Sequence, residues 1–217
     1  KELLKIMNKD VTFVFGASFI IGNYILPRFL NNLKENINNE VSINVSVSHE
    51  AIDDLLDKKI DMALVENYVS NDDIIYREWM EDEIVIFSNQ ELPARAKAED
   101  LLSYKWVCRN PESNTRAIFK ENLDKANFPD CDTFDVTSEV TSATTIVQTV
   151  LHSDKSLTPT VSIVSRNAIE SLLKSGALFE SRINNQKMVR KLYIAYRKDR
   201  KHDAFIDNVV DYLLKIK

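Results

Sequence analysis

Hydrophobic and polar positions follow two different periods in the first third of the chain. Residues 11–15 are β-branched or aromatic and predict a strand. From Ile21 onward the apolar positions recur at helical spacing; they are Ile25, Phe29, Leu33 and Ile37. Pro27 falls inside this pattern, so it either kinks the predicted helix or marks the first turn of the helix's main body. The pattern therefore predicts a strand, a turn and a helix.

The next segment repeats this order. Residues 41–47 alternate Val or Ile with Ser or Asn, which is typical of a strand with one buried face. Ser48 is placed to cap a helix that has Glu50 in its first turn, and residues 60–66 predict a short buried strand. The order β-α-β-α-β implies a parallel sheet with helical crossovers. In such sheets ligands bind beyond the carboxyl ends of the strands.

The remainder of the chain continues the alternation. Strands are predicted at 83–88, 105–108, 133–139, 161–164 and 191–196, with helices between them and a terminal helix at 203–215. Ser142 is placed to cap one helix, and Gly176 ends another. Residues 74–88 look antiparallel rather than parallel. Two α/β units are the simplest account of this pattern.

Composition and charge exclude several functions. The chain has 217 residues, of which 44% are hydrophobic and 28% are charged, and its formal net charge of −5 makes it a poor binder of nucleic acid by itself. No apolar run is long enough to span a membrane, and the first residues lack the features of a signal peptide. We therefore expect a cytoplasmic location with no membrane partner. The chain begins at Lys1 rather than Met, which leaves room for a preceding leader or domain.

Few residues point to catalysis, metal binding or a cofactor. Cys108 and Cys131 have neither metal-ligand nor C-x-x-C spacing and are expected to be buried thiols. The chain has three glycines and contains no nucleophile elbow, zinc-binding helix motif or phosphate loop. Adjacent acids, as in 78–83, usually form solvated faces. We expect no metal, no cofactor and no enzyme activity.

Three predicted helices begin with hydroxyl or amide side chains: Ser18, then Ser113, Asn114 and Thr115, and finally Thr141 and Ser142. Helix N-termini expose unpaired N–H groups, and a hydroxyl there either caps its own helix or binds a ligand oxygen. For any one of these residues, capping is the simpler interpretation, and it explains Ser142 fully. Gly16 and Ala17 leave room beside Ser18 for close approach of another group.

Several segments resemble the effector-binding domain of LysR-type transcriptional regulators. Residues 16–66 carry the small-Ser motif, a Gly-x-Tyr-x-Leu-Pro segment from Gly22 to Pro27, and Asp61 in an I-D-x-A-L strand. RNPESNTRAIF resembles the family's loop before a helix, with Ser113, Thr115 and Arg116 matching. SIVSRNAIESLLKSGALFE and RKLYIAYRKDR resemble the late part of the domain. The resemblance covers nearly the whole chain.

This resemblance implies a fold and a set of site residues. The fold would be two Rossmann-like lobes of the type 2 periplasmic-binding-protein kind, joined by two crossover strands and holding a small polar or anionic inducer in the cleft between them. Residues 11–83 and 191–217 would form one lobe and 84–190 the other, with 1–10 the remnant of a linker helix. The inducer would be contacted by Ser18, Phe19, Ile20, Glu66, Ser113, Asn114, Thr115, Thr141 and Ser142.

The resemblance also implies partners. A homodimer or homotetramer would form through the helix at 25–37 and an edge strand, and DNA would be bound by an N-terminal winged helix-turn-helix absent from this chain. Glu66 would repel an anion unless Arg109 or Arg116 pairs with it or it is protonated. Peroxide-sensing relatives have a cysteine near the position of Ser113, so redox sensing is not implied.

Ile20 and Ile21 stand where many members of the family have hydroxyls, and residues 151–159 replace a glycine-containing turn.

The alternative function is a solute-binding protein of a transporter. An enzyme would need an acid or base in the cleft, and only Glu66 is a candidate. The upstream coding sequence discriminates between these, since a helix-turn-helix favours the regulator and a leader peptide favours the transport protein.

Overall fold

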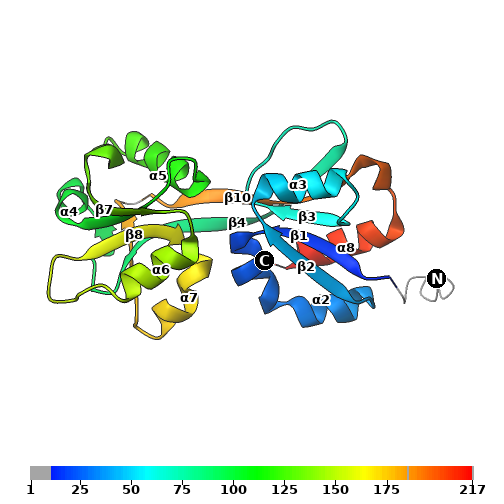
Figure 1. The fold of residues 1–217 in the computed structure, drawn as a ribbon, viewed down its shortest axis with the longest axis horizontal. Coiled ribbons are helices and arrows are strands. Elements are labelled where there is room, and N and C mark those ends of the chain that lie inside the picture. Colours follow the sequence, from blue (N-terminus) through cyan, green and yellow to red (C-terminus); the bar gives the residue numbers. More distant parts are fainter. Residues whose placement is uncertain (1–10, 185, 217) are drawn as a thin grey trace. The chain divides into compact units, whose positions relative to one another are not determined.

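Two α/β units are built from the chain, which a computed structural model describes for residues 11–184 and 186–216 (Figure 1). Unit 1 contains the described residues up to Glu81 and from Lys191 onward, and unit 2 spans Asp82–Arg190. The chain passes between them twice, in the long strands β4 (Ile74–Ser88) and β10 (Met188–Arg197). The predicted linker remnant at 1–10 lies outside the described residues.

Unit 1 is built on three parallel strands. β1 (Phe13–Ser18) lies between β2 (Val41–Ser46) and β3 (Met62–Val65), and β10 runs antiparallel to β3. The helical elements are the π-helical turn η1 (Ile21–Ile25), the 3₁₀ turns η2 (Leu26–Arg28) and η4 (Lys198–Arg200), and the helices α2 (Leu30–Ile37), α3 (Ser48–Leu56) and α8 (Ala204–Lys215).

Unit 2 combines parallel and antiparallel pairing. β6 (Lys105–Arg109) lies between β7 (Asp135–Val140) and β8 (Thr160–Ser165), parallel to both, and β8 runs antiparallel to β4. β9 (Phe179–Ile183) also pairs with β4 and carries the short β5 (Arg95–Ala96). The helical elements are α4 (Ala98–Ser103), α5 (Asn114–Lys125), the 3₁₀ turn η3 (Cys131–Thr133), α6 (Ala143–Leu151) and α7 (Arg166–Lys174).

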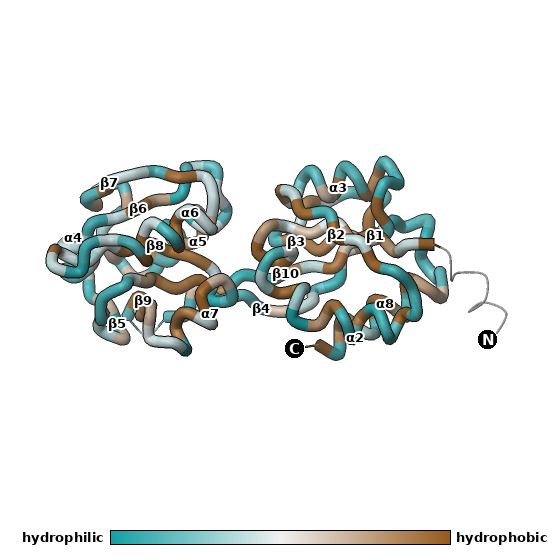
Figure 2. Tube along the Cα trace, turned by 60° about the horizontal axis from the view of Figure 1, so that its bottom comes forward, coloured by the Kyte–Doolittle hydropathy of each residue, from teal (hydrophilic) through white to brown (hydrophobic). Residues whose placement is uncertain are grey.

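Each unit has its own hydrophobic core. In unit 1, α3 packs Ala51, Ile52 and Leu55 against strand residues that include Ala63 and Val65. In unit 2, Trp106 stacks on Phe134 with ring centroids 4.8 Å apart and its indole N–H donates to Leu101 O at 2.9 Å. Figure 2 shows hydrophobic residues concentrated in strands such as β1 and β3, while the outer turns of α3 are hydrophilic. Burial of these faces fixes the strands whose ends carry the candidate site.

The first predicted helix is interrupted. Pro27 lies in the 3₁₀ turn η2, between the π-helical turn and α2, so it separates two helical segments rather than continuing one. Proline lacks the N–H needed for an α-helical bond to the preceding turn, which accounts for the break. The strand before it continues past residue 15 to Ser18. Gly176 follows α7 with φ of 73°, which confirms its predicted place at that helix's end.

Two predictions about unit 1 were wrong. β2 does not have one fully buried face, because Val45 is 37% exposed and Val41 and Ile43 are only half-buried. The cause is its position at the end of the strand order, where it pairs with β1 alone. Ser48 does not cap α3. The helix begins at Ser48 itself, and Val47 at the cap position makes no side-chain hydrogen bond.

Candidate functional site

The carboxyl end of β1 presents a buried hydroxyl. Ser18 is the last residue of this strand, and helical backbone begins at the next residue. Ser18 is 2% exposed, and its Oγ makes no hydrogen bond with any residue that the structure describes. The hydroxyl therefore does not cap the helix that follows it. A buried hydroxyl without a partner costs free energy, so this position is suited to a ligand that supplies one.

The two residues after Ser18 differ in exposure. Phe19 is 51% exposed, whereas Ile20 is 5% exposed and belongs to the core. Both lie in the first turn of the helical segment, where backbone N–H groups have no partner within the helix. Ile20 could therefore meet a ligand only through its backbone.

Glu66 stands directly after β3, the strand adjacent to β1. Its backbone N–H donates to Ser48 Oγ at 3.3 Å, and the residue is half-buried. The Ser48 hydroxyl thus links the first residue of α3 to the end of β3. Ser18 and Glu66 thus end adjacent parallel strands at one edge of the unit 1 sheet.

In unit 2, α5 begins after β6 with three of the predicted residues. Ser113 is the N-cap, and its Oγ accepts a hydrogen bond from Arg116 N at 3.5 Å. Thr115 is 6% exposed, and its Oγ1 accepts a hydrogen bond from Arg190 Nη1 at 3.4 Å. Asn114 is half-buried. Ser113 is therefore a helix cap, while Thr115 belongs to a buried polar cluster.

Thr141 and Ser142 lie between β7 and α6, and both are exposed. Ser142 caps α6, as its sequence position predicts, because its Oγ accepts from Thr145 N at 3.4 Å. The carbonyl of Thr141 accepts from Arg109 Nη2 at 2.9 Å, which joins the ends of β6 and β7. These side chains are the most solvent-accessible of the predicted set in unit 2.

Asp82 is a buried acid that the sequence did not single out. It lies in the run EWMEDE, which was interpreted as a solvated face, yet Asp82 is 0% exposed. Arg190 Nε donates to its Oδ2 at 2.9 Å, and Asn167 Nδ2 donates to its Oδ1 at 2.8 Å. Ser165 Oγ also donates to Oδ1. In the sequence, Asp82 stands two residues before the apolar run 84–87. The alternation of polar and apolar residues does not show whether such an acid is buried or exposed.

Arg116, which was considered as a partner for Glu66, has several partners within unit 2. Its Nη1 donates to Arg109 O at 2.8 Å and to Glu139 Oε2 at 3.0 Å, and its Nη2 donates to Asp132 Oδ1 at 3.3 Å. The guanidinium thus ties the start of α5 to the end of β6 and to β7. These bonds fix the helix terminus that carries Thr115.

One group among the described residues has metal-ligand chemistry, namely Asp130, Cys131 and Asp132, whose ligand atoms lie within 4.8 Å of one another. Lys120 Nζ already lies 3.0 Å from Asp130 Oδ2 and 3.2 Å from Asp132 Oδ2. Burial raises the pKa of the Cys131 thiol, which disfavours the thiolate that a metal requires. The lysine ammonium therefore already provides the charge neutralisation that a cation would supply.

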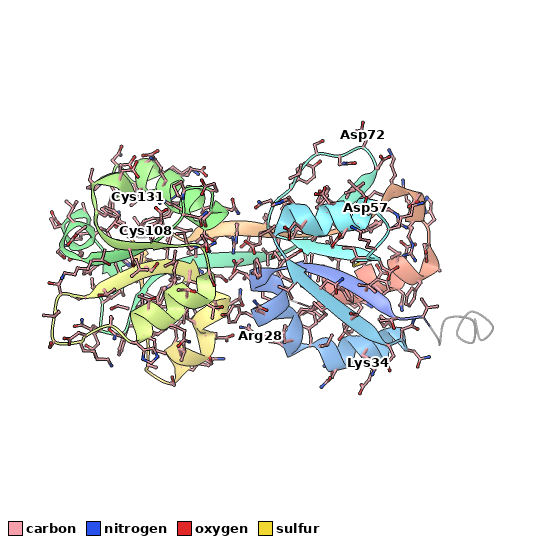
Figure 3. The ribbon with its side chains drawn as sticks, viewed as in Figure 1. Arg28, Lys34, Asp57, Asp72, Cys108 and Cys131 are labelled. Carbon is pink, nitrogen blue, oxygen red and sulfur yellow. The ribbon has the colours of Figure 1, made fainter. Side chains whose placement is uncertain are left out.

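Both cysteines are free and buried, as expected from the sequence. Burial raises the pKa of the Cys108 thiol to about 11. Figure 3 labels both residues in unit 2. Thiols held in the protonated form are poor nucleophiles.

Within the described part of the chain, none of the helices combines the length and apolarity that crossing a bilayer requires.

A family model described as the LysR substrate binding domain matches residues 10–216. The chain belongs to this family. YeiE of Escherichia coli (strain K12), described as an uncharacterized HTH-type transcriptional regulator, is 27% identical over 200 residues, which cover 90% of this chain and 65% of YeiE. The chain thus spans about two thirds of that relative's length.

Two solved structures show the same fold. The effector-binding domain of QuiR in complex with shikimate matches with a TM-score of 0.71 and 20% identity, covering 94% of this chain and 96% of that one. Full-length CbnR complexed with its target DNA matches with a TM-score of 0.75 and 12% identity, covering 99% of this chain and 73% of CbnR. The fold is therefore the α/β, type 2 periplasmic-binding-protein-like fold of LysR effector-binding domains.

Proposed function

We propose that this chain is the ligand-sensing part of a LysR-type transcriptional regulator and that it binds a small polar or anionic effector through groups at the carboxyl ends of its parallel strands. The observation that carries the proposal is the Ser18 hydroxyl, which is 2% exposed and has no hydrogen-bond partner among the described residues. In α/β folds, ligands bind at this edge of the sheet. Family membership supports the same assignment.

Within unit 2, Thr115 is the residue we assign most directly to the effector. Its hydroxyl is buried at the first turn of α5, close to backbone N–H groups that the helix leaves unpaired. Asn114, Thr141 and Ser142 are more accessible and would contact a bound effector from the same strand ends. Ser113 would act through its backbone, because its hydroxyl caps α5.

We infer binding without catalysis. Ser113 and Ser142 accept hydrogen bonds from backbone N–H groups, and Thr115 accepts one from a guanidinium, so these contacts are with hydrogen-bond donors rather than with a general base. YeiE is described as a transcriptional regulator, which favours a regulator over the solute-binding protein of a transporter.

DNA binding, self-association and a cytoplasmic location follow as parts of this proposal. CbnR was solved with DNA over a longer chain, and this chain covers 73% of it. We propose that a helix-turn-helix segment of the complete protein binds DNA and that α2 and the edge strand β2 mediate a homodimer or homotetramer. Regulation requires the effector to bind one conformation more tightly than another.

The test combines a ligand screen with two substitutions. A thermal-shift screen of small carboxylates, inorganic anions, amino acids and nucleotides identifies a binder, and calorimetry then compares Ser18→Ala and Thr115→Val with the unaltered protein. Each lost hydrogen bond should weaken binding by about 1 to 3 kcal/mol. Ser175→Ala at the C-cap of α7 and Thr149→Val within α6 remove exposed hydroxyls by the same substitutions and serve as controls. Unchanged affinity in both site variants would refute the assignment.

A further inference from the structure

Three buried polar residues form a chain of contacts in unit 2. Asp82 Oδ2 accepts from Arg190 Nε at 2.9 Å, and Arg190 Nη1 donates to Thr115 Oγ1 at 3.4 Å. Asp82 is 0% exposed, and Arg190 and Thr115 are each 6% exposed. The three residues come from β4, β10 and α5, so segments distant in sequence are joined at one buried point.

The direction of the last hydrogen bond determines what Thr115 can offer. A hydroxyl has one proton and two lone pairs, whereas a guanidinium has donors only. Thr115 Oγ1 is therefore the acceptor toward Arg190, and this is the one hydrogen bond its side chain makes with the described residues. Its proton stays available for a ligand. The neighbouring first-turn N–H groups of α5 are donors as well.

Asp82 holds the guanidinium in this orientation. Both of its oxygens are used, since Oδ1 accepts from Ser165 and Asn167 while Oδ2 accepts from Arg190 Nε. Arg190 Nη2 lies 2.8 Å from the same Oδ2. The hydrogen bonds from Ser165 and Asn167 hold the carboxylate independently of Arg190, and the carboxylate in turn restricts rotation of the guanidinium. Nη1 is consequently kept on the side of Thr115.

We propose that Arg190, held by Asp82, is a positioning residue that orients Thr115 as a hydrogen-bond donor and thereby selects effectors presenting an acceptor oxygen, such as a carboxylate, sulfate or phosphate group. The proposal rests on the proposed role of Thr115 in effector binding. The positive charge of Arg190 is balanced by Asp82 in the buried pair. Selection therefore comes from the orientation of the hydroxyl rather than from an unpaired cation.

The experiment titrates the protein with sodium acetate, sulfate and phosphate at constant ionic strength. Ethylammonium, similar in size to acetate but carrying only donors, is the comparison probe. We expect at least one anion to bind, with Thr115→Val and Arg190→Gln each weakening it by about tenfold, the effect of one lost hydrogen bond. Thr115→Ser should retain the affinity, because it keeps the hydroxyl.

A combined variant separates positioning from a general structural role. In the Thr115→Val background, Arg190→Gln should cause no further loss of anion affinity, since its effect acts through the hydroxyl. An equal additional loss would show that Arg190 only maintains the fold and would overturn the proposal. If Arg190→Gln leaves Asp82 unpaired and does not fold, the Asp82→Asn/Arg190→Gln variant removes both buried charges and should also bind the anion about tenfold more weakly.

Two further outcomes would overturn the inference: wild-type affinity in Arg190→Gln when Thr115→Val has lost it, or binding of none of the three anions. The proposed function fails separately. A compound from the broader screen that loses affinity in Ser18→Ala and Thr115→Val but keeps it in Asp82→Asn/Arg190→Gln would support that function while refuting the positioning role of Arg190.

Discussion

Ile60 lies against Gly16: its Cδ1 stands 2.5 Å from the place that a Cβ atom on Gly16 would take, and Ala51 Cβ stands 3.3 Å from it. The room beside Ser18 that the small residues suggested is therefore filled by the protein itself. Gly16 lets Ala51 of α3 and Ile60, two residues before β3, approach β1 closely. The role of Gly16 is therefore in packing rather than in ligand contact.

Gly16→Ala should lower the free energy of unfolding by about 1 to 3 kcal/mol, because Ile60 is 2% exposed and Ala51 is 1% exposed, so room for the added Cβ must come from shifts within the core. Gly22→Ala is the matched control. Its added Cβ would lie 2.6 Å from Val45 Cγ2, but Val45 is 37% exposed and can shift toward solvent. Urea denaturation measures both variants. A larger loss in Gly22→Ala would contradict this account of the packing.

Breaking the Asp82–Arg190 pair should destabilise the protein strongly. Arg190→Gln leaves the buried Asp82 carboxylate without its counter-charge, and removing one partner of a buried pair costs about 3 to 5 kcal/mol. The Asp82→Asn/Arg190→Gln variant removes both charges and should be less destabilised than the sum of the two single variants. Chemical denaturation of all four proteins gives the coupling energy. Additive losses would show that the pair does not interact as described.

Acid should remove a contribution that Asp203 makes to stability. Burial acts to raise the pKa of this carboxyl, but hydrogen bonds from Arg200 and from the backbone N–H groups of Phe205 and Ile206 outweigh it and leave the pKa below its ordinary value. A lowered pKa in the folded state stabilises the protein at pH values above the unfolded pKa, and the contribution is lost as pH falls through the folded pKa.

Asp203→Asn should therefore be less stable than the unaltered protein near neutral pH, and the difference should shrink between about pH 5 and pH 2. Asparagine can still accept the backbone N–H bonds that begin α8, so the loss reports mainly the contact with Arg200, whose Nη2 lies 2.7 Å from Asp203 Oδ2. Thermal denaturation across this range measures the difference. A difference that stays constant with pH would argue against a lowered pKa.

Cys108 and Cys131 should react slowly with thiol reagents in the folded protein. Burial raises the pKa of both thiols, that of Cys108 to about 11, so little thiolate is present at about pH 8. Reaction with an aromatic disulfide should accelerate greatly when denaturant exposes both side chains. Cys108→Ser and Cys131→Ser identify the contribution of each. Rapid modification of either thiol under native conditions would contradict the described burial.

Periodicity predicted much of the fold because burial imposes it. The helices carrying Ile146 and Ile169 and the buried strand β3 show in the sequence as apolar stripes or runs. β9 was missed because three of its five residues are polar, so it forms no apolar run, and the six-residue α4 gives too few repeats to define a helical period. β7 was predicted as a strand, yet most of it is exposed, because alternation does not reveal whether anything covers the inner face.

The candidate site was less predictable than the fold. Ser18 and Thr115 were chosen because hydroxyls at helix starts can bind ligands, but the same rule selected Ser113 and Ser142, which the structure shows as ordinary caps. Only the three-dimensional contacts separate the two groups. Asp82 and Arg190 were missed because their partnership joins residues 108 positions apart, a distance over which sequence pattern carries no signal.

Because β4 and β10 are neighbours in the strand order, the single stretch Asp82–Arg190 leaves and re-enters unit 1 at adjacent strands. In genetic terms, unit 2 is one uninterrupted insert in the coding sequence of unit 1. Recombination at two codons would exchange the whole insert together with Asp82, Thr115 and Arg190, while Ser18 and Glu66 stayed with the host segment. Under the proposed function, such an exchange would replace the Thr115 contact and leave the Ser18 contact in place.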